Sequence, residues 1–381
     1  MKQVIVGTRD TSRWPEFAGS TWVRLQYMLG LQKMGVESFW VDRLSAVDPV
    51  EHPHTLEYLV ERFDHTARQF GFEDRYCIVY DKGEKYFGLS ERSLRALANS
   101  AGLLLNISGH LPPESPLMKV PGRAYVDVDP GFTQIWAGQY DMGIDRHNCF
   151  FTVGQNVGRP EFTIPLRGVD WKPILPPVAL DHWPAKIDER CRRIGTVGDW
   201  RGNQHAIHDD EYYGGKRREY VRLLHLPEVA DVRPELALCI GNEDWEDMGL
   251  LQEAGWRVLD PYLYAGDPAS YREFIQLSRA EFSVAKSGYV KSNSGWISDR
   301  TACFLASGKP VLIQSTGCEW LFPERKGLLT FRTREEAVAS LKAINDDYLA
   351  HCRAARELAE RLFDATRILG TILSHAGTSR R

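Results

Sequence analysis

The chain has 381 residues and is 43% hydrophobic, and this length exceeds what one hydrophobic core usually supports, so two domains are expected. Its 47 basic and 51 acidic residues give a net charge of −4, which argues against a protein that holds nucleic acid through a strong positive field. No segment approaches the roughly 20 apolar residues that span a bilayer. The seven cysteines show no CxxC pair and no zinc-like spacing, so we expect reduced thiols, a cytoplasmic protein and no metal site.

Strands and helices alternate along the first half of the chain. The opening stretch, MKQVIVGTRD, meets charge after a few apolar residues and predicts a strand, not a signal peptide. Apolar residues between Ser20 and Gly35 fall near one face of a helix, and VESFWVD predicts the next strand. This strand–helix–strand order is the unit of a parallel sheet. Further strands are predicted at RYCIVYD, GLLLNISG, RAYVDVDPG and HNCFFTVG, with a helix at SERSLRALANSA.

A proline-rich stretch, GVDWKPILPPVALDHWP at residues 168–184, interrupts this alternation and predicts a stiff linker, although a surface loop within one domain is the alternative. A new strand–helix series runs from RRIGTVGDW to GLLTF, and the tail from Arg334 is helical. We expect an α/β fold with Rossmann-like parallel sheets in two domains, residues 1–167 and 185–345. The helical segment 346–381 either packs back on the first domain or forms a dimer surface.

The stretch KSGYVKSNSGWISDRTACFLASGKPVLIQSTG, residues 286–317, predicts a Gly/Ser loop, a helix and a strand in that order. Ser298 is the expected N-cap, and Gly308 the expected end of the helix. A helix start behind such a loop offers backbone N–H groups and a positive dipole to an anion, although a capped helix with nothing bound is the plainer alternative. The candidate ligands of a diphosphate are Arg201, Lys286, Ser294, Gly295, Trp296, Ser298, Arg300 and Thr301.

Two other loops follow predicted strands of the same domain. They are TVGDWRGN, residues 196–203, and STGCEW, residues 315–320. In an open α/β sheet the loops after the carboxyl ends of the strands face one crevice, so both loops should lie near the 286–301 loop.

These three motifs make the second half of the chain resemble the donor domain of a GT-B glycosyltransferase, and GSTWVRLQYMLGLQKMGVESFWVD resembles the start of the acceptor domain. The resemblance covers nearly the whole chain as architecture, and residues 195–340 as specific motif. It implies a nucleoside-diphosphate sugar as donor. The residues that it places at the nucleoside or sugar are Gly198, Trp200, Asp299, Thr316, Gly317 and Glu319.

One position departs from the family pattern. Many GT-B enzymes carry a ribose-binding Glu five residues before the Gly of the "GxP" step, and here that residue is Cys303. A thiol cannot hold a ribose diol as a carboxylate does. Asp299, one helical turn earlier, is the candidate replacement.

Three residues of the first domain are candidates for a catalytic group near the acceptor hydroxyl: Asp10, His110 and Asp129. Each follows a predicted strand, and each has a structural alternative as a turn cap or a packed histidine. The pair His52 and His54 has no third ligand with matching spacing, so a solvated loop is favoured over a metal site. Candidate stacking faces for a sugar or a flat acceptor are Trp14, Trp136 and Trp200.

Three functions fit this reading. The first is a metal-independent glycosyltransferase without a cofactor, which moves a sugar from a nucleoside-diphosphate sugar to a small-molecule or glycan acceptor. The second is a nucleotide-sugar epimerase of the same fold. The third is a non-catalytic subunit that binds a sugar nucleotide, and Cys303 is the feature in its favour. No nucleic-acid partner is expected, and a homodimer is an open alternative.

Overall fold

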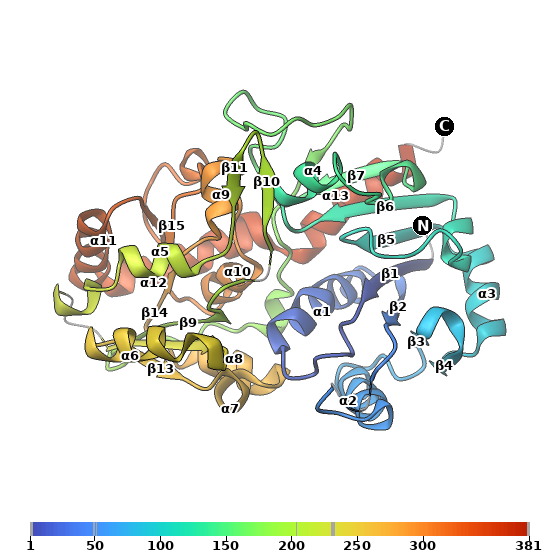
Figure 1. Ribbon diagram of the computed structural model, residues 1–381, viewed down its shortest axis with the longest axis horizontal. Coiled ribbons are helices and arrows are strands. Elements are labelled where there is room, and N and C mark those ends of the chain that lie inside the picture. Colours follow the sequence, from blue (N-terminus) through green and yellow to red (C-terminus); the bar gives the residue numbers. More distant parts are fainter. Residues whose placement is uncertain (1–2, 49, 51, 203, 230–232, 379–381) are drawn as a thin grey trace.

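The computed structural model describes residues 3–378 except 49, 51, 203 and 230–232, and shows two α/β domains side by side (Figure 1). The first sheet has the strand order β4-β3-β2-β1-β5-β6-β7-β8, and only β4 runs antiparallel to its neighbour. Its strands are β1 Gln3–Arg9, β2 Glu37–Leu44, β3 Tyr76–Tyr80, β4 Lys85–Gly88, β5 Leu103–Ile107, β6 Gly122–Asp127, β7 Cys149–Thr152 and β8 Lys172–Pro173. Its helices are α1 Ala18–Lys33, α2 Leu56–Gln69, α3 Glu91–Ser100 and α4 Phe132–Trp136.

The second sheet is parallel throughout, with the order β13-β12-β9-β14-β15-β16. Its strands are β9 Arg193–Asp199, β12 Arg233–Cys239, β13 Arg257–Leu259, β14 Ala280–Ser283, β15 Val311–Gln314 and β16 Leu328–Phe331. In chain order this is 3-2-1-4-5-6, the doubly wound arrangement whose ligand crevice lies where the strand order reverses. Here the reversal lies between β9 and β14.

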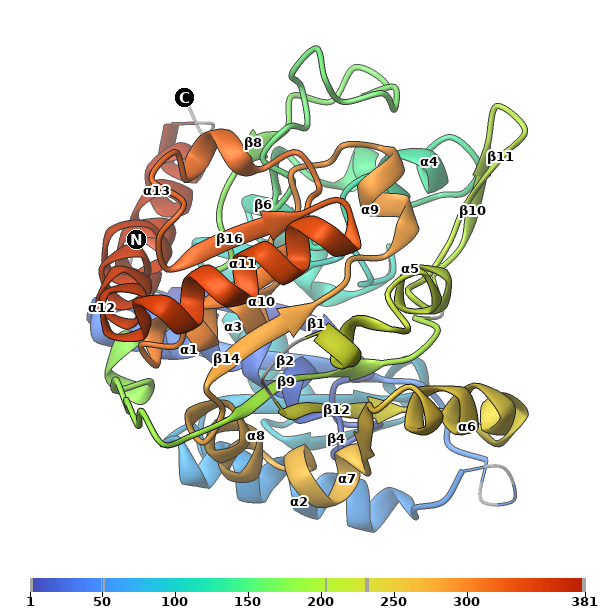
Figure 2. The ribbon, with the colours of Figure 1, turned by 90° about the vertical axis from the view of Figure 1, so that its left-hand side faces the viewer.

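Helices flank this second sheet, and α11 lies across β16 at its edge (Figure 2). They are α5 Arg217–Arg222, α6 Trp245–Glu253, α7 Pro261–Ala265, α8 Pro268–Gln276, α9 Ser287–Lys291, α10 Asp299–Ala306, α11 Arg334–Asp346 and α12 Tyr348–Leu358. Short 3₁₀ turns occupy Asp81–Gly83, Pro116–Lys119, Ile144–Arg146, Leu180–His182, Leu226–Val229, Asn242–Asp244 and Glu319–Leu321. A hairpin of β10 Ala206–His208 and β11 Glu211–Tyr213 stands out from the second domain and contacts α4 of the first.

The chain crosses between the domains twice. Within residues 168–184, β8 adds to the edge of the first sheet, while the Trp183 ring is buried against Trp22 and Tyr271. The chain returns through a π-helical turn, Ala359–Phe363, and ends in α13, Ala365–Thr378, which packs on α1, β6 and β7 of the first domain. From the sequence, the C-terminal segment was expected either to pack back on the first domain or to form a dimer surface. In the structure it packs back on the first domain.

Helix α1 is buried on every side. Its predicted apolar face packs on the first sheet, but Gly30 faces α13, and Trp22 donates a hydrogen bond of 2.9 Å to the Pro268 carbonyl at the start of α8. Helix α1 therefore belongs to both domains, which explains why polar residues such as Gln26 are buried on it.

Several elements differ from the sequence expectation. Helix α2 begins at Leu56 behind an N-cap at Thr55, inside the stretch expected to be a solvated loop. The predicted Gly/Ser loop contains the short helix α9. Within the second strand–helix series, the sequence GGKRREYVRLLHLP is typical of a helix, but α5 covers only Arg217–Arg222. The β10–β11 hairpin was not predicted because its strands are only three residues long, too short to show the alternating pattern of a strand.

The packing of α13 on α1 can be tested at Gly30. A Cβ atom added there would lie 2.5 Å from Leu369 Cδ1 and 2.7 Å from Ala365 Cβ. We expect Gly30→Ala to lower the free energy of unfolding by about 1–3 kcal/mol, because the two helices must separate. Gly370→Ala on α13 is the control, since the nearest atom, of Met34, is 4.0 Å away. Thermal or urea unfolding measures both, and equal stability of the two variants would contradict this packing.

Candidate functional site

Two neighbouring cavities lie between the domains. The first, here called the aromatic cavity, has a volume of about 310 Å³ and is walled by the start of α1, the ends of β9 and β12, and α7. The second, here called the cationic cavity, has a volume of about 230 Å³ and is walled by α1, residues 128–129, 153 and 176–177, and the α9–α10 region. The two cavities share Val23, Ser298, Asp299 and Arg300.

The N-terminus of α10 stands where the cavities meet. As predicted, Ser298 caps this helix, and its hydroxyl accepts a hydrogen bond of 3.2 Å from the backbone N–H of Arg300. The Arg300 side chain is held by Glu281 at 2.7 Å and by the Val197 carbonyl at 2.7 Å. Arg300 therefore braces the helix against β9 and β14, and contributes its charge to the cavity walls.

Asp299 occupies the first position of α10 and lines both cavities. Burial raises the pKa of its carboxyl, although the charges of Arg300, Arg24 and Lys216 oppose this rise. A carboxyl at this junction can accept hydrogen bonds from hydroxyl groups of a ligand that spans the two cavities.

Lys216 is a functional candidate that the sequence reasoning missed. It is only 8% exposed, it lines the cationic cavity, and no ion pair or side-chain hydrogen bond to it is present among the described residues. Burial, with the nearby charges of Arg300 and Lys286, lowers its pKa to about 7. A Cβ atom added to Gly198 would lie 3.3 Å from its Nζ, so the glycine at the end of β9 leaves room for this ammonium group.

The signal for Lys216 in the sequence is weak. It is the GGK step before α5, and Gly215 sits so close to Arg201 that an added Cβ would lie 1.5 Å from the Arg201 carbonyl oxygen. The close approach of these two segments folds the hairpin back and brings Lys216 to β9. Lys216 and β9 are separated in the sequence, so no local pattern indicates that they lie close together.

Two predicted residues meet across the domain interface. Lys286 of the second domain donates to Asp129 of the first at 2.7 Å, and the Tyr289 hydroxyl donates to the same carboxylate oxygen. Burial alone would raise the pKa of Asp129, but the charge of Lys286 and these hydrogen bonds outweigh it and lower the pKa. Arg24, with a buried Nε that lacks a partner, lies in the wall of the same cavity.

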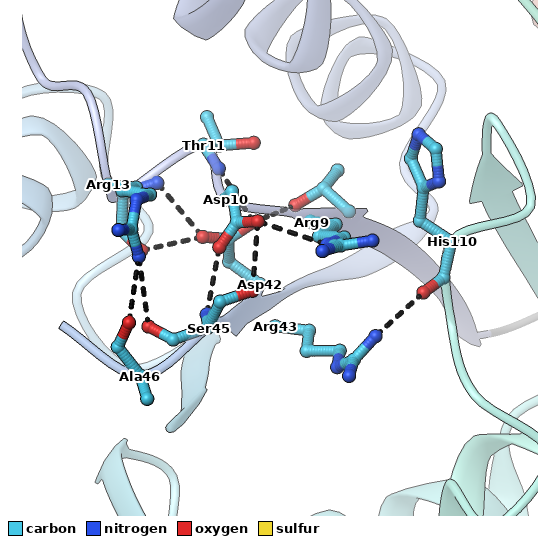
Figure 3. Close-up of polar contacts among 11 residues, drawn as sticks. Arg9, Asp10, Thr11, Arg13, Asp42, Arg43, Ser45, Ala46 and His110 are labelled. Carbon is cyan, nitrogen blue, oxygen red and sulfur yellow. Dashed lines mark hydrogen bonds and ion pairs between the residues drawn. The ribbon is translucent and has the colours of Figure 1, made fainter. Parts of the chain in front are cut away.

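The other two catalytic candidates lie outside both cavities. The Asp10 carboxylate accepts hydrogen bonds from the Ser45 N–H at 2.8 Å, the Ser45 hydroxyl at 3.0 Å and Arg9 at 3.0 Å (Figure 3). Beside it, buried Asp42 accepts from the backbone of Thr11. These bonds hold the turn after β1, which is the structural role that the sequence left open for Asp10.

His110 follows β5, and its carbonyl accepts a long hydrogen bond of 3.5 Å from Arg43 (Figure 3). The residue is exposed, but the protein around its ring still removes part of the surrounding water. This desolvation, with the charges of Arg9 and Arg24, lowers its pKa to about 4. The imidazole is therefore neutral at physiological pH and can accept or donate one hydrogen bond.

Several predicted ligands of the donor do not face the cavities. Trp200 is 1% exposed, stacks on Tyr220 and donates to Asp247, so its ring belongs to the core. Ser294 and Thr301 are fully buried, and the Ser294 hydroxyl donates to the Tyr289 carbonyl. These three predictions are corrected, because no surface of these side chains is left for a ligand.

The remaining predicted residues hold loops together. Arg201 forms a two-pronged ion pair with Asp244, at 2.6 and 2.5 Å. Gly295 and Thr316 are joined by a backbone bond of 2.7 Å, and the Thr316 hydroxyl donates to the Trp296 carbonyl. Gly317 and Glu319 also make contacts within the protein. Gly317 lies against Asn156 of the first domain, and Glu319 forms an ion pair with Arg332 beside a separate pocket. Of the predicted diphosphate ligands, the cationic cavity is lined by Lys286, Trp296, Ser298 and Arg300.

Cys303 is turned away from both cavities. It is 2% exposed and its sulfur accepts a hydrogen bond of 3.4 Å from Gln26 of α1, whose Oε1 in turn accepts from the Ala179 N–H at 2.7 Å. The residue therefore belongs to the contact between α1 and α10.

Aromatic side chains mark the mouth of the aromatic cavity. Phe17 of the first domain and Tyr262 of the second are partly exposed, with ring centroids 6.2 Å apart and ring planes 11° apart. Trp14 stacks on Phe17, whereas Trp136 donates to the His205 carbonyl at the base of the hairpin. Of the three predicted stacking tryptophans, Trp14 therefore contacts Phe17, a residue of the wall of the aromatic cavity.

Among the described residues, no group of His, Cys, Asp or Glu is arranged to hold a metal ion, and His54 instead pairs with Glu16. No helix in the described part of the chain has the length and apolar character that a bilayer crossing needs.

Two doubly wound domains that face each other across a cleft, with a loop that leads into the capped start of α10 in the second domain, are characteristic of the GT-B fold. Residues 223–373 match the family model described as glycosyl transferase-like. No curated protein sequence matches the chain significantly.

The solved structures bear out the fold. An alpha-glucosyltransferase, solved with UDP and a 13-mer DNA containing a HMU base, is 12% identical, with a TM-score of 0.64 over 98% of this chain and 99% of that one. AviGT4, a glycosyltransferase involved in avilamycin A biosynthesis, is 13% identical, with a TM-score of 0.55 over 100% and 98%. Anabaena Alr3699/HepE, solved with UDP and glucose, is 10% identical, with a TM-score of 0.58 over 99% and 100%.

The charge of Lys216 predicts how anion binding depends on pH. Its ammonium group loses its proton around pH 7, so we expect the affinity for inorganic pyrophosphate to fall between about pH 6 and pH 8. Binding should also take up protons in this range, because a bound anion raises the pKa of Lys216. Calorimetric titration in two buffers of different ionisation enthalpy measures the uptake.

Lys216→Met isolates this effect, since the pH dependence that remains in the variant belongs to pyrophosphate itself. Burial disfavours the charge of Lys216, so the variant should not be less stable than the wild type. Lys342→Met, on the exposed face of α11, is the matched control. Identical proton uptake by the wild type and Lys216→Met would contradict the prediction.

Proposed function

We propose that the protein is a glycosyltransferase that moves a sugar from a nucleoside-diphosphate sugar to an acceptor hydroxyl or amine. The observation that carries this proposal is the cationic cavity, where Lys216 and Lys286 flank the N-terminus of α10. Several cations with exposed N–H donors at a helix start suit a diphosphate. The match of residues 223–373 to a glycosyl transferase-like model supports the same activity.

The donor is a UDP sugar in this proposal, because the alpha-glucosyltransferase and HepE were both solved with UDP. Its base and ribose enter the aromatic cavity, and Asp299 accepts hydrogen bonds from the ribose hydroxyls. The diphosphate lies at the start of α10 beside Lys216. The sugar points into the cationic cavity toward Asp129.

The first domain supplies the acceptor side. Asp129 is the favoured general base, because it lines the cavity proposed for the sugar. His110 remains a second candidate as a neutral imidazole, for a hydrogen bond to the sugar or the acceptor. Asp10 is the least favoured of the three candidates, since Ser45 and Arg9 already occupy its carboxylate.

Residues 1–167 and 185–345 act as the two domains of this reaction, and movement about residues 168–184 opens the cleft. Closure excludes water and limits hydrolysis of the donor. The buried cations balance the charge of the leaving diphosphate, so the proposed reaction uses no metal and no cofactor. We place the protein in the cytoplasm, where nucleotide sugars are available to it.

The acceptor is a small molecule or a glycan in this proposal. The alpha-glucosyltransferase was solved with DNA, but the net charge of −4 in the present chain favours an acceptor other than nucleic acid. The neighbours are sugar transferases by name, which favours transfer over epimerisation.

A thermal-shift screen with nucleoside diphosphates and their sugars tests the donor. We expect UDP and at least one UDP sugar to raise the melting temperature, because a ligand that binds only the folded state stabilises it. Lys216→Met should abolish most of this shift, whereas Lys342→Met should retain it. Slow release of UDP from the sugar that binds best would then demonstrate chemistry, and separate an enzyme from a binding subunit. No shift with any nucleotide would refute the proposal.

A further inference from the structure

The cationic side chains near the cavity differ in whether a carboxylate or carbonyl of the protein already binds them. Arg300 is bound to Glu281, Val197 and Ser283 within its own domain. Arg201, which was predicted to reach the diphosphate, is taken by Asp244 and does not line the cavity. Neither guanidinium group can turn to a ligand without breaking these bonds.

Two amines remain beside the start of α10. Lys216 has no ion-pair partner among the described residues, whereas Lys286 is paired with Asp129. A sugar-linked diphosphate carries two negative charges, and a buried charge needs a close counter-charge. Arg24 also lines the cavity, but its guanidinium donates to the Ser20 carbonyl and hydroxyl at 3.0 and 2.9 Å within α1. Lys216 alone does not balance two charges, so we expect the diphosphate to draw on Lys286 as well.

Asp129 and the diphosphate therefore compete for the ammonium group of Lys286. The Lys286 side chain is 12% exposed and that of Asp129 is 23% exposed, so the pair is largely desolvated. Lys286 is also enclosed by rings, with Nζ 5.1 Å from the centroid of Tyr289 and 5.7 Å from that of Phe132. Its ammonium can turn from Asp129 toward the start of α10 within the same cavity.

We propose that Asp129 forms an ion pair with Lys286 in the donor-free protein, and that the diphosphate of the donor replaces Asp129 as the partner of Lys286. Asp129 is then released to act as the base. This inference rests on the proposed function and adds a binding order, in which the donor binds before the acceptor. The Tyr289 hydroxyl stays with Asp129 and keeps the carboxylate in place.

The released carboxylate is a better base. While Lys286 is beside it, its charge and hydrogen bond help to lower the pKa of Asp129. Without that charge, burial raises the pKa toward the range where a carboxylate accepts a proton readily. The acceptor oxygen then forms a bond to the anomeric carbon and its proton passes to Asp129. The bond from the anomeric carbon to the phosphate oxygen breaks, and Lys216 and Lys286 balance the leaving diphosphate.

The competition predicts an unusual result for one variant. We expect Asp129→Asn to bind UDP at least about fivefold more tightly than the wild type, because UDP no longer displaces a carboxylate from Lys286. The same variant should lose transfer activity. Lys286→Met should bind UDP more weakly, and calorimetric titration measures all three proteins.

The double variant distinguishes competition from a general loss of negative charge. If Asp129 acts through Lys286, Asp129→Asn should tighten UDP binding much less when Lys286 is already Met. Asp141→Asn, whose carboxylate pairs with Arg146 on the surface, is the matched control and should bind UDP as the wild type does. Melting temperatures without ligand establish that the variants are folded.

The outcomes separate the two proposals. If UDP binds the wild type but Asp129→Asn binds it equally or more weakly, the competition is refuted and the proposed function stands. An equal gain from Asp129→Asn with and without Lys286 also refutes the competition, since repulsion alone then explains it. If UDP binds none of the folded proteins, the proposed function itself fails.

Discussion

The convergence of cationic side chains at the start of α10 is the constraint on which the cleft depends. Arg24, Lys216, Lys286 and Arg300 approach one another where little water is present, and like charges in such a place repel strongly. The protein relieves this repulsion in different ways. Glu281 and Asp129 neutralise two of the cations, and the lowered pKa of Lys216 lets that amine lose its proton. In the proposed function, the diphosphate of the donor supplies the negative charge that is still missing.

The same contacts determine how the domains meet. The Lys286–Asp129 pair crosses the cleft beside Gly131, where an added Cβ would lie 2.7 Å from Ser292 Oγ. On the other side, Asn156 of the first domain donates to the carbonyls of Asn293 and Gly317 at 2.9 and 3.0 Å. Loops that looked like ligand contacts in the sequence are therefore contacts between domains. A Gly/Ser-rich loop suits either role, because both require close approach to the backbone.

The sequence predicted the fold well because hydrophobic periodicity reports burial. The strands from β1 to β16 that are long and apolar were found, and Ser298 was assigned correctly as the cap of α10. Strands of only three residues, such as those of the hairpin, are too short to carry such a signal. For the site, residue type and loop position identified Lys286, Asp129 and Asp299, whose placement in one cavity follows from strand order.

The sequence could not distinguish residues that face the cavity from neighbours that face inward. Ser294 and Ser298 are four residues apart in one loop, yet the first is sealed beneath α9 and the second caps α10 at the cavity. Lys216 is the opposite error: it was not predicted to be a site residue, yet it lines the cavity, because the hairpin before it folds back and brings it to β9. Both errors come from side-chain direction and long-range contact, which a one-dimensional pattern does not contain.

The structure also gives a physical reason for Cys303. Helix α1 lies so close to α10 that Gln26 reaches the sulfur, and Trp22 of the same helix reaches α8. A carboxylate at this position would be buried beside the Gln26 amide and would be costly to keep charged. A thiol avoids this cost. The first turn of α10 is then the nearest place where a carboxylate can face the cavities, and Asp299 occupies it among Arg300, Arg24 and Lys216. The close packing of α1 on α10 therefore supports the proposal that recognition of the ribose has moved from position 303 to Asp299.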